Sequence, residues 1–134
     1  RPCLSPNGKY IAWGPGDHEI AISTINLDGP KPKVGDRILQ ILDKKNKLYH
    51  VDWSRDSAHL SLSRGPKGKG DLSKKSTHTA ACEIVGVYAK GWDIYKIDSG
   101  LRGKINITNT ITEGVEKITT DGMSNKESDW LVIK

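Results

Sequence analysis

The chain carries the run Leu4-Ser5-Pro6-Asn7-Gly8-Lys9-Tyr10-Ile11-Ala12-Trp13, which returns as Trp53-Ser54-Arg55-Asp56-Ser57-Ala58-His59-Leu60-Ser61-Leu62. The dipeptide Asp52-Trp53 returns once more as Asp129-Trp130. A unit repeated at this spacing cannot bury its apolar face alone and must stack on copies of itself. The sequence therefore predicts a stack of repeated units before any single residue suggests a function.

Each repeat is predicted to consist of short strands. Turn signals such as Pro6-Asn7-Gly8 and Asp28-Gly29 separate short runs rich in β-branched residues, which is typical of strands and too short for helices. The predicted strands are 10–13, 19–27 and 37–42 in the first unit, and 48–53, 59–63, 92–97 and 104–108 in the second. On the pattern of the second unit, we expect units of four strands in one antiparallel meander, and hence an all-β fold.

Four-stranded meanders in series are the blades of a β-propeller. We expect blade one at about 4–42, blade two at about 48–108 with an insertion at 64–91, and the start of a further blade at about 127–134. Trp13, Trp53, Trp92 and Trp130 each fall on or beside a predicted strand, so we expect their rings to pack between blades.

The run at 5–13 resembles the W-S-P-D-G-K-x-I-A-F signature of TolB-type, WD40-like propeller repeats. Residues 93–100 and 105–109 match the companion pattern, a D-I-Y-V-M-D-x-D-G strand followed by x-L-T-N. Leu4 stands where tryptophan is usual, and Arg55 and Ser57 replace proline and glycine, so the second turn is the weaker match. The resemblance implies a propeller and, because such proteins are often periplasmic or secreted, that location.

The second unit is longer than the first. Trp53 follows Leu4 by 49 residues (53 − 4), whereas Trp130 follows Trp53 by 77 (130 − 53). Most of the excess is a glycine-rich, basic stretch from 64 to 78 and a more apolar stretch from 80 to 88, which could form an extra strand. In a meander, this insertion shares one end of the sheets with 43–47 and 109–126. Loops held on a rigid sheet commonly carry function, so we predict a partner-binding face at Lys67, Lys69, Lys74, Lys75 and His78.

About two units are present in the 134 residues, whereas a propeller normally needs four or more blades to close. The first residues are Arg1-Pro2, and both ends fall inside repeat units. We therefore expect the chain either to be a segment of a larger protein or to complete its stack by pairing with other chains, because an open blade would expose unpaired edges and an apolar face.

The net charge of +5 would suit a protein that binds the phosphates of nucleic acid. The basic runs at 31–33, 44–47 and 64–75 contain no aromatic residues and match no base-reading motif. Such runs are commonly solvated loops. We therefore expect the positive charge to favour an acidic protein partner. A basic nucleic-acid-binding module is the alternative.

The cysteines and histidines suggest no cofactor. Cys3 and Cys82 could form a disulfide in an oxidising compartment or remain buried thiols. His78 and Cys82, with Glu83, are possible zinc ligands, but the second pair that a zinc motif needs is missing. There is no C-x-x-C-H haem motif and no apolar run of membrane-spanning length.

Motifs of common enzymes are also missing: the chain has no G-x-S-x-G, no P-loop, no G-x-G-x-x-G before a helix and no H-E-x-x-H. We therefore predict a non-catalytic scaffold for protein binding. In the alternative, the blades belong to a larger enzyme whose catalytic residues lie outside this chain. The blades resemble those of prolyl-oligopeptidase-type enzymes, which suggests a hydrolase. Residues 83–88 resemble part of the propellers of multihaem enzymes such as hydrazine synthase, which suggests a periplasmic redox complex.

Overall fold

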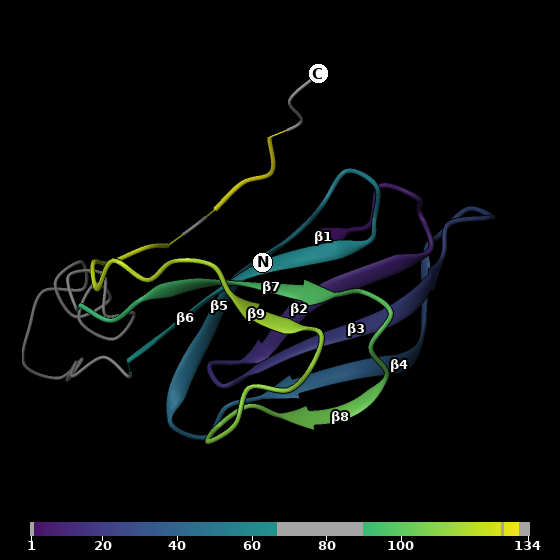
Figure 1. Cartoon of the computed structure of the whole chain (residues 1–134). Helices are drawn as coiled ribbons and strands as arrows, with labels where there is room; N and C mark the ends of the chain where they lie inside the picture. The colour runs from purple at the N-terminus through teal and green to yellow at the C-terminus, as the bar shows by residue number, and fades with distance from the viewer. Residues whose placement is uncertain (1, 67–89, 127, 132–134) are drawn as a thin grey trace, which may run out of the picture.

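A computed structural model describes residues 2–66, 90–126 and 128–131. The described residues form an all-β structure of two sheets with no helix (Figure 1). The strands are β1 (Cys3–Leu4), β2 (Tyr10–Gly16), β3 (Glu19–Asn26), β4 (Lys33–Leu42), β5 (Asn46–Trp53), β6 (His59–Pro66), β7 (Asp93–Asp98), β8 (Gly103–Asn106) and β9 (Val115–Lys117). The expectation of an all-β chain is confirmed.

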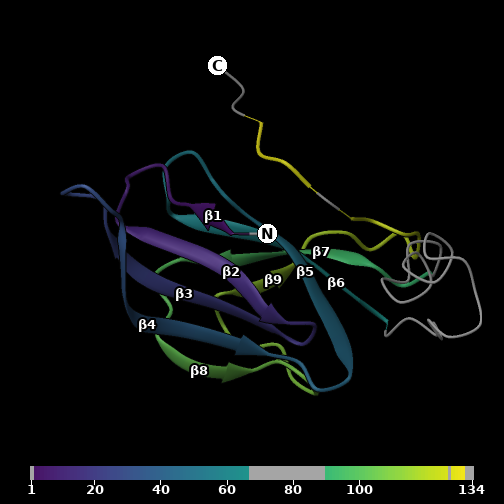
Figure 2. The same cartoon turned by 180° about the vertical axis from the view of Figure 1, so that it is seen from behind.

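The first sheet has the strand order β1-β2-β3-β4-β8, as seen from its own side in Figure 2. Strands β1 to β4 follow one another as antiparallel neighbours, which is the meander predicted for the first unit. Strand β8 comes from much later in the chain and pairs with β4 in parallel. The predicted strands 10–13, 19–27 and 37–42 all fall on this sheet, although β4 begins earlier than predicted, at Lys33.

The second sheet has the order β5-β6-β7-β9 and is antiparallel throughout. Here the prediction was wrong in one place, because 104–108 is not the last strand of the second unit. Strand β8 crosses to the first sheet, and β9, predicted as part of a connection, takes the fourth position. The cause is burial: Ile105 packs against the core, and Ile107, just after β8, is fully buried and donates its N–H to Leu42 O at 2.9 Å.

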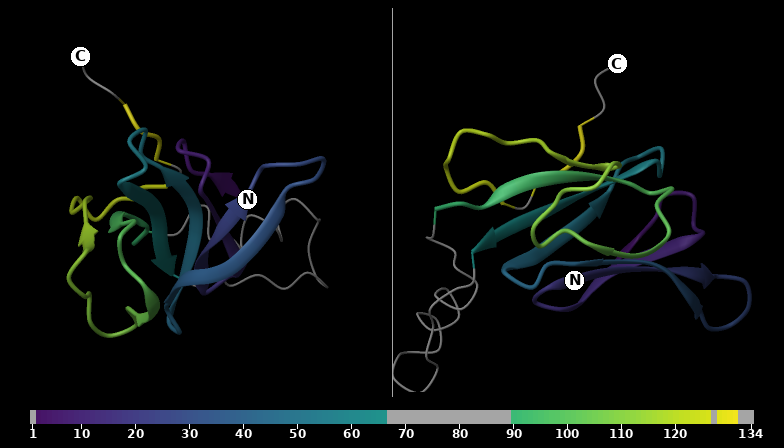
Figure 3. Two further views of the ribbon diagram at one scale, coloured as in Figure 1. Left: turned by 90° about the vertical axis from the view of Figure 1, so that its right-hand side faces the viewer. Right: turned by 60° about the horizontal axis from the view of Figure 1, so that its bottom comes forward.

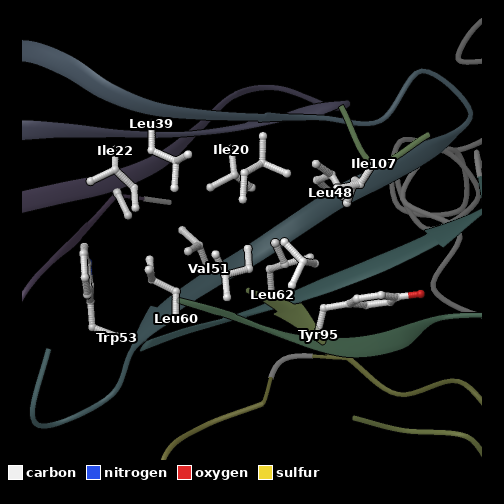
Figure 4. Close-up of a cluster of buried hydrophobic side chains, with 14 residues drawn as sticks. Ile20, Ile22, Leu39, Leu48, Val51, Trp53, Leu60, Leu62, Tyr95 and Ile107 are labelled. Carbon is white, nitrogen blue, oxygen red and sulfur yellow. The ribbon is translucent and has the colours of Figure 1, made fainter. Parts of the chain in front are cut away.

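The core lies between the two sheets, which form separate layers in both views of Figure 3. In Figure 4, Ile20, Ile22 and Leu39 of the first sheet point toward Leu60 and Leu62 of the second. These side chains alternate along their strands with residues on the outer faces, as the two-residue period of a strand requires. Neither sheet could bury these side chains without the other.

Trp53 is the tryptophan that packs between the sheets. It is buried, its ring stacks on Tyr10 at a centroid distance of 6.2 Å, and its Nε1 donates to Cys3 O at 3.1 Å. Trp13 instead lies half-buried beneath Arg37, 5.6 Å from the guanidinium carbon. Trp53 therefore packs between the two sheets as predicted, whereas Trp13 lies on the face of the first sheet that is turned away from the second.

The two copies of the turn have the same geometry, although their sequences differ. Ser5 Oγ donates to Asn7 Oδ1 at 2.7 Å, and Ser54 Oγ donates to Asp56 Oδ1 at 2.6 Å. Gly8 has φ 71° and Ser57 in the second copy has φ 61°, a left-handed conformation that costs free energy for a residue with a Cβ. Ser57 Oγ compensates by accepting the N–H of Asn7 at 3.1 Å, which ties the two turns together.

Removing a large side chain from the layer between the sheets should destabilise both. Leu62 is 0% exposed, so Leu62→Ala should lower the free energy of unfolding by roughly 2–5 kcal/mol through lost burial and a residual cavity. Val34, on β4, is 57% exposed, and Val34→Ala should change the free energy by less than about 0.5 kcal/mol. Urea unfolding of both variants measures this, and equal losses would contradict the assigned core.

Candidate functional site

Five chain segments meet at one end of the two sheets, which we call the loop end. It comprises Asp43–Lys45 between β4 and β5, Arg64–Pro66 at the close of β6, residues 90–92 before β7, and residues 107–109 and 124–126. The register places Asn46 opposite Pro66, so the 43–47 turn lies beside the point where the insertion leaves the sheet. Lys45 Nζ donates to Asn109 Oδ1 at 2.8 Å, which adds the segment after β8. The prediction of a shared end holds for 43–47 and for the two described ends of the insertion. For 109–126 it was wrong in part, because β9 runs along the second sheet and Gly114 O accepts the N–H of Asp98 at the opposite end, at 2.8 Å.

Asp43 is the centre of the loop end. Its side chain is fully buried, and its Oδ2 lies 2.6 Å from Arg64 Nε. Its Oδ1 accepts the backbone N–H groups of Lys45 at 2.8 Å and Asn46 at 2.9 Å, which forms the turn into β5. Burial alone would raise the pKa of Asp43, but hydrogen bonds from Asn46, Lys45 and Arg64 outweigh it and lower the pKa below the ordinary aspartate value of 3.8.

Arg64 extends from Asp43 to the rest of the loop end. Its NH1 donates to Tyr95 Oη at 3.0 Å, its NH2 donates to Ile107 O at 3.2 Å, and its guanidinium lies over the Tyr95 ring at 5.4 Å. Burial acts to lower the pKa of Arg64, whereas Asp43 and Tyr95 act to raise it and prevail. The Arg64 side chain thus joins β6 to the β4–β5 turn, to β7 and to the segment after β8.

Trp92 closes the loop end on the outer side of the second sheet. The Trp92 side chain is fully buried. Its backbone carbonyl accepts the N–H of Asn125 at 2.8 Å, and its backbone forms a parallel β-bridge with Ser124. Lys126 lies over its ring at 4.5 Å, and Tyr49 meets it edge-on at 6.5 Å. The base of the insertion is therefore held by a large buried ring as well as by the buried ion pair.

The exposed cations of the loop end include Lys44, Lys45 and Lys90. Lys47, in the same basic run, is different: it is buried and pairs with Asp17 at 3.1 Å. Lys33 begins β4, and Lys31 precedes it, so both lie at the opposite end from Asp43. The basic runs at 31–33 and 44–47 therefore do not converge on one surface.

Several predicted site residues lie outside the described residues. These are Lys67, Lys69, Lys74, Lys75, His78 and Cys82. The thiol of Cys3 donates to Asp52 Oδ1 at 3.2 Å, and a Cys3–Cys82 disulfide remains a prediction. Within residues 2–66, 90–126 and 128–131, no three His, Cys, Asp or Glu side chains are grouped to hold a metal ion. The same ranges contain no helix that could span a membrane.

Sequence reasoning missed Asp43, Arg64 and Tyr95 as the residues that organise the loop end. The pattern Asp43-Lys44-Lys45-Asn46 carries a signal for the turn, since an aspartate commonly accepts backbone N–H groups two or three residues later. Nothing in the sequence indicates that Arg64 would pair with this aspartate, because the two residues are joined through the packing of two sheets.

Comparison of the chain with protein-family models, with curated proteins and with solved structures finds no match. The functional interpretation therefore depends on the repeat and on the geometry of the loop end.

Asp43→Asn should destabilise the protein at neutral pH by roughly 3–5 kcal/mol, because it leaves the Arg64 guanidinium without its buried counter-charge. The lowered pKa means that the Asp43 carboxylate stabilises the fold above about 3.8, and that this contribution is lost as the pH falls through the still lower folded-state pKa. The gap in unfolding free energy between wild type and variant should therefore shrink below pH 3.8. Urea unfolding at pH 7 and in steps below pH 4 measures it, and a constant gap would refute the assignment.

Gly65→Ala should disturb the loop end, because a Cβ at position 65 would overlap the indole ring of Trp92. Accommodating it should cost roughly 1–3 kcal/mol and increase the exposure of Trp92. Gly16→Ala is the matched control, since a Cβ there meets nothing within 4 Å. Urea unfolding and near-ultraviolet circular dichroism report the two effects, and similar spectra for both variants would contradict the clamped indole.

Proposed function

We propose that the two sheets are successive blades of a β-propeller and that the chain works as a non-catalytic scaffold, which offers its loop end to a protein partner. The repeated turn, the meander of the first sheet and the seat of Trp53 against the preceding sheet support the blade assignment. The resemblance to TolB-type repeats supports it further and is the reason to expect a periplasmic or secreted protein.

One observation carries the scaffold proposal: the base of the insertion is clamped by fully buried groups. Asp43 and Trp92 are both 0% exposed, and Arg64 of β6 links the β4–β5 turn, β7 and the segment after β8. Loops fixed at their base on a rigid sheet lose less conformational entropy on binding than free loops do. The clamp thus suits a surface whose task is to present side chains to another molecule.

The charge of this surface indicates the chemistry of the partner. Lys44, Lys45 and Lys90 are exposed at the end where the described chain leaves β6 at Pro66 and returns before β7. Such a surface favours an acidic protein and speeds its association at low salt. Nucleic acid is the weaker alternative, because the other exposed basic run, at 31–33, lies at the opposite end and cannot follow the same phosphate backbone.

Charge reversal at the loop end should weaken partner binding, and the same reversal elsewhere should not. A chain with Lys44→Glu and Lys45→Glu should recover the partner roughly tenfold less well from source-cell extract, because two favourable rim charges become repulsive. Lys31→Glu with Lys33→Glu is the control, with the same change in net charge at the opposite end. Quantitative mass spectrometry of proteins captured by each variant, repeated after nuclease treatment, makes the comparison.

Three outcomes of that comparison would count against the scaffold proposal. Equal loss of the captured proteins by both variants would mean that net charge, and not the loop end, governs binding. Capture that disappears after nuclease treatment would indicate nucleic acid. Recovery that is unchanged by reversal of Lys44 and Lys45 would remove the loop end as the binding surface.

A further inference from the structure

The outer face of the second sheet has the same place in its unit as the face that the first sheet buries. We define this outer face by residues that the register places on one side: His59, Ser61, Ile94, Lys96, Glu116 and Ile118. Their counterparts in the first sheet, by repeat and register, are Tyr10, Ala12, Ile20, Ile22, Leu39 and Ile41. That set lies against the second sheet. By the logic of the repeat, the outer face is a surface on which a further sheet would rest.

Trp130 repeats on the second sheet the contacts that Trp53 makes on the first. The Trp130 ring stacks on His59 at 6.4 Å and 19°, as the Trp53 ring stacks on Tyr10 at 6.2 Å and 18°. Its Nε1 donates to Asp52 O at 3.4 Å, as that of Trp53 donates to Cys3 O at 3.1 Å. The repeat relates Tyr10 to His59 and Cys3 to Asp52, so the two tryptophans occupy equivalent positions. We call each position, defined by the stacked ring and the carbonyl that accepts from Nε1, the seat of its tryptophan.

The seat of Trp130 is only partly filled. Beside the ring is a pocket of about 220 Å³ lined by Ser61, Ile94, Ile118 and neighbouring residues. Ser61 is 5% exposed, yet its Oγ has no hydrogen-bond partner, and neither has His59 Nδ1. Ile118 and Leu131 are 50% and 84% exposed. Orphaned polar atoms beside exposed aliphatic side chains mark a surface that lacks its covering.

We infer that the outer face of the second sheet is the docking surface for a third sheet of the same repeat, whose first strand is begun by this chain's own Asp129–Leu131. The inference rests on the proposed function in taking the sheets as blades. It names the face, the anchoring tryptophan and the kind of sheet that binds.

The outer face also specifies the chemistry of the sheet that covers it. Ile94 and Ile118 require apolar side chains opposite them, as Ile20 and Ile41 have in the first interface. Lys96 and Glu116 pair at 2.6 Å where the first sheet has Ile22 and Leu39. The third sheet therefore has polar groups opposite this pair, since a buried ion pair needs further hydrogen bonds to offset its desolvation.

A second copy of the chain does not fit this surface while Trp130 holds its seat. The first unit of a copy would bring Leu4, the repeat counterpart of Trp53 and Trp130, to the position that the Trp130 ring occupies. The occupant is thus a sheet that uses Trp130 as part of its first strand and not one that displaces it.

A fusion supplies such a sheet. Residues 5–47 are repeated directly after Trp130, so that Trp130 takes the place of Leu4 in the added unit. We expect amide exchange in β7 and β9 to be slowed about tenfold relative to the unmodified chain, because covering the outer face suppresses local opening. The same fusion with Ser61→Arg should exchange like the unmodified chain, since the arginine occupies the pocket beside Trp130.

Unchanged amide exchange in the fusion, or equal protection in the fusion with Ser61→Arg, would overturn the inference.

Sedimentation velocity tests whether a second copy is the occupant. The inference would be overturned if the unmodified chain associated with rising concentration and Ser61→Arg abolished that association. If the fusion does not fold, the unmodified chain still decides. In that chain, Ser61→Arg should make the fluorescence of Trp130 more accessible to iodide quenching. The same measurement with Trp130→Phe gives the contribution of the other tryptophans. An unaltered quenching constant for Trp130 would contradict its assigned position on His59. None of these readouts measures partner binding at Lys44 and Lys45, so the proposal that the loop end binds a partner is tested separately.

Discussion

The apolar layer between the two sheets is the constraint on which the rest of the structure depends. Each sheet has one face of aliphatic side chains that water would penalise, and each face is covered by the other sheet. Burial of this layer holds the repeat units at a fixed spacing and sets the seat of Trp53.

The loop end depends on this layer for its geometry. Asp43 and Arg64 belong to different sheets, and their contact exists because the layer aligns the end of β4 with the end of β6. Once aligned, the Asp43 carboxylate is fully buried and both of its oxygens accept hydrogen bonds, the condition under which a buried charge is tolerated. The clamp is therefore a consequence of the stacking, and the insertion inherits a rigid base from it.

Two devices compensate where the repeat has diverged. Ser57 adopts the left-handed backbone of Gly8, and its hydroxyl bonds the first turn in return. In the second sheet β8 is replaced by β9, while β8 extends the first sheet and brings Ile107 between the layers. Stacked units of this kind conserve the positions of their contacts more closely than the identity of the residues that make them.

The positions of most strands and of the two repeated turns followed from the sequence alone, because alternation, β-branching and turn residues act within a few neighbouring residues. The repeat likewise indicated that the units stack and that Trp53 packs between them. Only the tertiary structure decided that β8 joins the first sheet, that Arg64 finds Asp43, and that Trp92 closes the far side of the second sheet. Short strands carry similar local signals, so the choice between β8 and β9 was made by where Ile105 and Ile107 could be buried. That depends on the shape of the whole core and not on any local pattern.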